Sequence, residues 1–152
     1  MAEGEVRIVR LEPMRVASTL GFGPQPELEA WDKLMTWARA TNHLDGTQRY
    51  FGFNNPNPMP GSPNYGYEQW MTVGPDVEPV ADVEIKNFEG GLFGVLRCSG
   101  LATIEEDWGR LAAWLEASTH RADDRECLEE LLSSPVLPHT EWVFDLYVAI
   151  GE

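Results

Sequence analysis

The sequence lacks most of the features that mark membrane, secreted or metal-binding proteins. No apolar run approaches the ~18 residues that cross a bilayer, and no charged-then-apolar signal pattern begins the chain. The only cysteines, Cys98 and Cys127, form no CxxC pair, so we expect free thiols in a cytoplasmic protein. The three histidines have no metal-ligand spacing, and we expect no metal and no cofactor.

Positive charge is also scarce. The chain has 11 Lys and Arg against 25 Asp and Glu, a formal net charge of −14 at pH 7. Such a chain repels polyanions, so nucleic acid and anionic membranes are poor partners and cationic ligands are favoured. The acidity is equally explained by solubility. No phosphate-binding Gly-rich loop or nucleophile elbow stands in the required context.

Apolar and aromatic residues, by contrast, are plentiful. Apolar residues make up 43% of the 152 positions, and six Trp, four Tyr and six Phe are present. This composition suits one folded domain of residues 1–152 rather than a disordered chain.

The sequence repeats itself with a shift of 77 residues. Residues 6–73 align with residues 83–150 without a gap and share eleven identities, against about four expected from ordinary composition. The pairs Trp31/Trp108 and Trp37/Trp114 lie in matching helical segments. We predict a duplicated unit, with the two copies related by a pseudo-two-fold axis, over chance similarity between two amphipathic helices.

Two matching strands organise the repeat. Residues 67–73 and 144–150 both read aromatic, acid, variable, aromatic, aliphatic, small, aliphatic. Because side chains alternate between the faces of a strand, Phe144, Leu146, Val148 and Ile150 should face the core. The opposite face should carry Glu68 with Trp70 and Asp145 with Tyr147, and we expect this face to be functional.

The remaining pattern predicts an α+β fold of two tandem βαββ units, with antiparallel sheets, helices on one side and a ligand cleft between the units. Strands are expected in residues 5–22, broken near Pro13, and in residues 48–54, 83–88, 92–99 and 141–150. Helices are expected over residues 27–40, with an apolar stripe of Leu28, Trp31, Leu34, Met35 and Ala38, and after a capping box at residues 103–106.

Three further features give more specific predictions. Residues 124–134 have helical propensity, but the repeat favours a short strand. Residues 55–64 contain four prolines and read either as a stiff connection or as a lid. The four helix tryptophans should pack between helix and sheet.

These motifs resemble the GyrI-like family, also called the bacterial transcription activator effector-binding domain, which has a SOUL-related fold. The similar segments are Gly21-Phe22-Gly23-Pro24, Phe51 to Pro56, Tyr67-Glu68-Gln69-Trp70 and Trp142 to Ile150. Many relatives have Glu, then an aromatic and then Pro where this chain has Asp145, Tyr147 and Ala149. The first expected strand begins near Met1, which disfavours a regulator with a preceding helix-turn-helix.

The resemblance implies a hydrophobic, aromatic-lined cleft between the two units in which an acid meets cationic drugs. On this basis we expect a stand-alone binding protein that sequesters hydrophobic small molecules, cationic or flat and aromatic, such as drugs or toxins. The ligand-binding residues predicted on this basis are Glu68, Trp70, Asp145, Tyr147, Phe53, Asn55, Tyr65 and Tyr67. A carboxylate among aromatic rings should have a raised pKa unless a cation joins it, and a lipophilic cation would supply that charge.

Two other functions stay open at this point. Some relatives are hydrolases that open the cyclopropane ring of DNA-alkylating natural products; here Glu68, with a raised pKa, would position or deprotonate water and Tyr147 would donate a proton. Tyr147 is preferred to Tyr67 because Tyr67 should face the core. Gyrase-inhibitor-like binding of a protein partner is disfavoured because the negative charge is spread along the chain.

Overall fold

The computed structural model describes residues 6–41, 47–55, 59–80, 83–133 and 141–151. Over these residues the chain has eight strands and two α-helices, and the strand pairs are antiparallel, which confirms the α+β class. The chain divides into two compact units, residues 13–89 and residues 90–152 together with 1–12. Neither described α-helix is long and apolar enough to cross a membrane.

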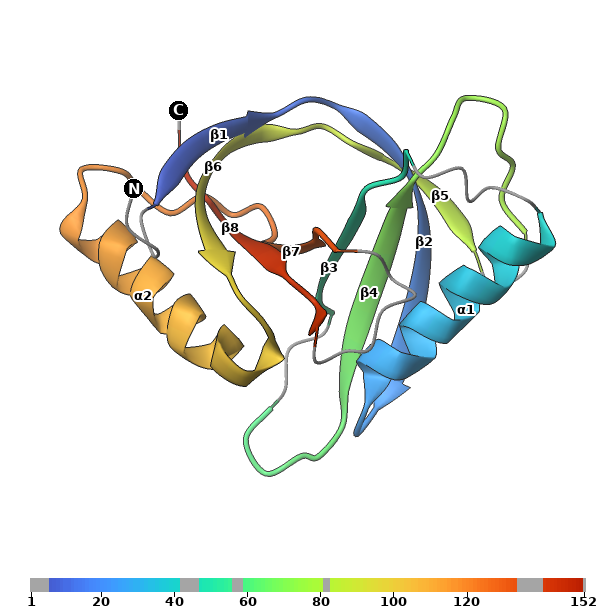
Figure 1. Ribbon diagram of the computed structural model, residues 1–152, viewed down its shortest axis with the longest axis horizontal. Coiled ribbons are helices and arrows are strands. Elements are labelled where there is room, and N and C mark those ends of the chain that lie inside the picture. Colours follow the sequence, from blue (N-terminus) through green and yellow to red (C-terminus); the bar gives the residue numbers. More distant parts are fainter. Residues whose placement is uncertain (1–5, 42–46, 56–58, 81–82, 134–140, 152) are drawn as a thin grey trace. The chain divides into compact units, whose positions relative to one another are not determined.

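The 13–89 unit is a four-stranded sheet with one helix on one face. Its strands lie in the order β3-β4-β2-β5, and α1 lies along β2 and β4 (Figure 1). The elements are β2 (Met14–Gly23), α1 (Pro26–Ala40), β3 (Tyr50–Asn54), β4 (Tyr65–Thr72) and β5 (Glu84–Phe88). The Thr19 hydroxyl donates to the carbonyl of Ala30 at 2.6 Å and fastens the helix to the sheet.

The 90–152 unit has the corresponding arrangement. Its strands lie in the order β7-β8-β6-β1, and α2 packs on β6 and β8. The elements are β1 (Arg7–Leu11), β6 (Gly91–Cys98), the 3₁₀-helix η1 (Leu101–Thr103), α2 (Ile104–Ala117), β7 (Leu128–Leu131) and β8 (Phe144–Ala149). Residues 128–131 are therefore a strand, as the repeat predicted against their helical propensity.

Strand pairing in the two units follows one register. Ser18 is opposite Trp70 in the β2–β4 pair, and the residues 77 positions further along, Val95 and Tyr147, are opposite each other in the β6–β8 pair. The β3–β4 and β7–β8 pairs correspond in the same way, as do the β2–β5 and β6–β1 pairs. This shared register supports duplication of one unit. The pseudo-two-fold axis and the cleft between the repeats stay predictions.

The compact units do not coincide with the sequence repeats. Each repeat contains two strands before its helix, and the first of these belongs to the other repeat's sheet. Thus β1, from the first repeat, pairs with β6, and β5, from the second repeat, pairs with β2. The exchanged strands place charged side chains from one repeat on the sheet of the other.

The helix predictions are correct in position and wrong in two details. Leu28 was placed on the apolar stripe of α1 but is 48% exposed, because the buried side of the helix runs through Ala30, Leu34 and Ala38. Helix α2 begins at Ile104 as expected, but Thr103 makes no side-chain capping hydrogen bond. Its hydroxyl instead lies 3.2 Å from a carboxylate oxygen of Asp107.

The tryptophans of both helices pack towards their sheets, as predicted. Trp31 meets the ring of Tyr50 in β3 edge-on, with centroids 5.3 Å apart, and Trp37 is buried. The Trp108 indole donates to Glu129 in β7 at 3.0 Å, and Trp114 packs over Gly94 in β6. Of the predicted lid loop, residues 56–58 lie outside the described residues.

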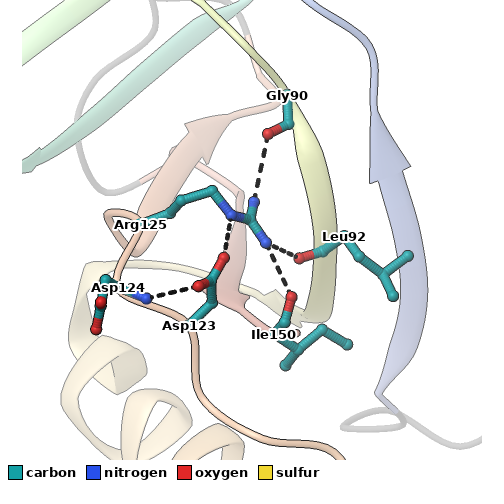
Figure 2. A network of polar contacts seen from close by, with 6 residues as sticks. All are labelled: Gly90, Leu92, Asp123, Asp124, Arg125 and Ile150. Carbon is teal, nitrogen blue, oxygen red and sulfur yellow. Dashed lines mark hydrogen bonds and ion pairs between the residues drawn. The ribbon is translucent and has the colours of Figure 1, made fainter. Parts of the chain in front are cut away.

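Arg125 fastens the start of β6 to the end of β8 (Figure 2). Its guanidinium group donates to the backbone carbonyls of Gly90, Leu92 and Ile150 and pairs with the carboxylate of Asp123. The same group lies 4.5 Å from the ring centroid of Phe93. Glycine is required at position 91 for two reasons. A Cβ there would collide with this guanidinium group, and the backbone has a φ of 133°, which other residues rarely adopt.

Two glycines of the 90–152 unit should respond oppositely to alanine. A Cβ at Gly94 would lie 2.6 Å from the Trp114 ring, whereas a Cβ at Gly109, inside α2, would have no neighbour within 4 Å. Urea unfolding should show Gly94→Ala destabilised by about 1–3 kcal/mol, because the ring must shift. It should show Gly109→Ala stabilised by about 0.5–1 kcal/mol, because alanine favours the helix. Equal effects of the two substitutions would contradict this packing.

Candidate functional site

Glu68 lies in the middle of β4, on the face of the 13–89 sheet that points away from α1. The next residue of β4, Gln69, points to the opposite face. It is paired with Thr19 of β2, whose hydroxyl bonds to α1, so this opposite face is the one that the helix covers. Glu68 is only 3% exposed. A buried carboxylate is costly unless charge and hydrogen bonds compensate for its lost hydration.

Four side chains provide that compensation. Three donors meet at oxygen Oε2, namely the Trp70 indole Nε1 at 2.6 Å, the Lys86 ammonium at 2.7 Å and the Ser18 hydroxyl at 2.8 Å. The Asn55 amide donates to Oε1 at 3.0 Å. These donors come from four segments, β4, β5, β2 and the end of β3, so the sheet must be assembled before the carboxylate is held.

The hydrogen bonds decide the protonation of this acid. Burial is the largest single influence and acts to raise the pKa of Glu68, but the bonds from Lys86, Trp70, Ser18 and Asn55 together outweigh it. The pKa of Glu68 therefore lies below its ordinary value of 4.5. The raised pKa expected for a catalytic base is wrong here, because a cation within the chain joins the carboxylate.

Two aromatic rings pack on the Trp70 side chain that bonds this carboxylate. The Trp70 ring lies 5.1 Å from Phe53, edge-to-face, and 5.4 Å from Phe88. Further along the same face of β2, Leu20 is 48% exposed and Phe22 is 60% exposed. The face that carries the charged group thus also carries the buried rings of Trp70 and Phe53 and the exposed apolar side chains of Leu20 and Phe22.

In the 90–152 unit, Asp145 takes the place of Glu68. It is 5% exposed and bonds two arginines, Arg7 of β1 at 2.8 Å and Arg97 of β6 at 2.7 Å. On the same face the hydroxyl of Tyr147 donates to Glu130 at 2.6 Å, and the Tyr147 ring meets Phe93 edge-on.

Comparison with known proteins gives the family. The model of the GyrI-like small molecule binding domain matches residues 4–150. The chain belongs to this family. A search of curated proteins finds no match.

Several solved structures share the GyrI-like fold. A hydrolase from Listeria innocua is 13% identical with a TM-score of 0.73, over 99% of this chain and 94% of that one. The C-terminal domain of EcmrR is 10% identical with a TM-score of 0.76, over 97% and 98%. SAV2435 bound to tetraphenylphosphonium is 7% identical with a TM-score of 0.56, over 97% and 94%. At these identities the likeness shows the fold alone.

The GyrI-like domain brings together only some of the predicted site residues. Glu68, Trp70, Phe53 and Asn55 share one face of the 13–89 sheet, and Asp145 and Tyr147 share one face of the other sheet. Two predicted tyrosines lie elsewhere. Tyr65 donates to Glu27 of α1, and Tyr67 packs over Gly52 on the helix-facing side, as its alternation predicted.

Sequence reasoning missed every cation that the two acids bind. Lys86, Arg7 and Arg97 have no counterpart of the same charge 77 residues away, so the repeat carried no signal for them. Glu130 was missed for the same reason, since Phe53 occupies its position in the first repeat. Among the described residues no group of three or more His, Cys, Asp or Glu could hold a metal ion.

The ionised form of Glu68 should stabilise this domain in a pH-dependent way. Because its folded pKa is lowered, the stabilisation is present above the ordinary value of 4.5 and is lost as the pH falls through the folded pKa. Glu68→Gln should therefore lower the free energy of unfolding by about 1–3 kcal/mol at pH 7, measured by urea unfolding, and by less at pH 3. Glu106→Gln, at an exposed position of α2, is the control. A deficit for Glu68→Gln that is constant from pH 7 to pH 3 would refute the assignment.

Proposed function

We propose that this domain binds hydrophobic small molecules, cationic or flat and aromatic, on the Glu68 face of the 13–89 sheet. The observation that carries the proposal is a 3%-exposed, ionised carboxylate that accepts a hydrogen bond from the Trp70 indole and lies opposite Phe53, whose ring packs on Trp70. Ring area supplies affinity that tolerates differences in ligand shape, and the carboxylate adds a preference for positive charge.

Two further features support this function. The exposed side chains of Leu20 and Phe22 extend the apolar surface beyond the buried rings. The net charge of −14 draws cations towards the protein as a whole. One protein of the same fold, SAV2435, has been seen bound to tetraphenylphosphonium, a lipophilic cation. Asp145 and Tyr147 stay predicted ligand-binding residues.

Ligand charge gives the direct test. Tetraphenylphosphonium and tetraphenylborate have similar size and shape but opposite charge, and calorimetry should show the cation bound more tightly. Glu68→Gln should weaken binding of the cation by about tenfold and leave the anion unweakened, because only the cation gains from the carboxylate. Glu106→Gln removes the same charge from an exposed helical position and should leave both affinities unchanged. Equal loss for both ions in Glu68→Gln would refute a charge-specific role.

Hydrolysis of strained rings is the second candidate, and one contact favours it. Asn55 and oxygen Oε1 of Glu68 form a polar pair that could orient a water molecule, and structures of the same fold include hydrolases from Listeria innocua. The lowered pKa of Glu68 argues against it, because a more acidic carboxylic acid is a weaker base.

Mass spectrometry separates the two functions. We expect that incubation with a cyclopropane-bearing alkylator yields no more ring-opened water adduct with the wild-type protein than with Glu68→Ala. Adduct formation by the wild-type protein well above both Glu68→Ala and buffer would instead establish the hydrolase.

A further inference from the structure

We propose that Lys86 is an internal counter-ion that occupies the place of a ligand's cation at Glu68, so that ligands bind there by displacing it. This inference rests on the proposed function and names the residue that sets its charge selectivity. The ligands of the site are then hydrophobic cations that can compete with an ammonium group for the carboxylate.

The geometry puts Lys86 where a ligand cation would be. Its ammonium nitrogen lies 2.7 Å from Oε2 of Glu68, the oxygen that also accepts the bond from the Trp70 indole. Lys86 reaches this oxygen from β5, whose residue Phe88 lies on the same face and packs on Trp70. A cation at this point therefore meets a carboxylate and an aromatic side chain together.

Lys86 is the exchangeable member of the group. Its side chain is 39% exposed, whereas that of Glu68 is 4% exposed, and β5 forms the edge of the unit's sheet. A lysine side chain can swing into water with little loss, because its ammonium group is strongly hydrated there. The other donors, Ser18, Trp70 and Asn55, are neutral and would still hold the carboxylate in position.

Displacement explains how a site with balanced charge can select for cations. With Lys86 in place the pair is neutral, and an uncharged ligand gains no electrostatic contact that would offset moving the ammonium group. A cationic ligand replaces the ion pair between Lys86 and Glu68 by its own ion pair with Glu68 and adds contact with the aromatic rings. Its binding is therefore the exchange of one cation for another.

Lys86→Met tests the exchange because it keeps the aliphatic stem and removes the charge. Calorimetry should show tetraphenylphosphonium bound roughly ten- to a hundredfold more tightly than by the wild-type protein, and tetraphenylborate bound more weakly. The control is Arg110→Met, which removes a 57%-exposed cation from another buried carboxylate, Asp107, in the other unit. The control should bind the cation with wild-type affinity. Lys86→Arg should also stay close to wild type.

A second measurement uses the wild-type protein and so does not depend on how a variant folds. Lys33 and Lys86 are the only lysines of the chain, so their ammonium groups can be followed individually by nitrogen-15 NMR. Saturating tetraphenylphosphonium should shift the Lys86 ammonium signal towards that of a solvated lysine and leave the Lys33 signal unchanged.

The outcomes separate this inference from the proposed function. If the wild-type protein binds the cation but Lys86→Met binds it no more tightly and the Lys86 signal does not move, the exchange is wrong and the binding function stands. If only Lys86→Met binds the cation, Lys86 occupies the site as proposed and the wild-type function is wrong. If neither protein binds it, both proposals fail.

Discussion

The structure depends on neutralising two carboxylates that the sheets bury. Glu68 and Asp145 occupy matching positions on the last strand of each repeat, and each is at most 5% exposed. A buried carboxylate without a partner costs several kcal/mol. Each acid receives a cation from the exchanged strand: Lys86 of β5 reaches Glu68, and Arg7 of β1 reaches Asp145. One repeat folded alone would lack these partners, which couples the folding of the two halves of the chain.

Different residues compensate the buried acid in the two sheets. In the 13–89 unit three neutral donors and one lysine hold the acid, while in the 90–152 unit two arginines do so. Trp70 of the first unit is replaced by Tyr147, whose hydroxyl is bonded to a further buried acid, Glu130. The two sheets therefore differ in charge while sharing one strand register. The face is more polar in the 90–152 unit and more aromatic in the 13–89 unit.

Charge pairing also decides which chemistry suits Glu68. A carboxylate held by an ammonium group and three neutral donors stays ionised and is a weak base, so it is better suited to recognising a cation than to removing a proton from water. The rings of Trp70 and Phe53 add an apolar surface that has no precise polar code. This combination agrees with membership of a family of small-molecule binding domains.

The sequence by itself determined the fold class, the positions of the helices and most strands, and the orientation of Tyr67. These follow from local periodicity and from the 77-residue repeat, which even favoured a strand over helical propensity at Leu128–Leu131. Only the tertiary structure decided that β1 and β5 are exchanged and that Lys86 and Arg7 meet the two acids. The physical reason is that ion pairs between distant strands depend on how the strands are aligned across the sheet. Periodicity along the chain does not contain this alignment, and the repeat gives no sign of it because the matching charges are absent from the other copy.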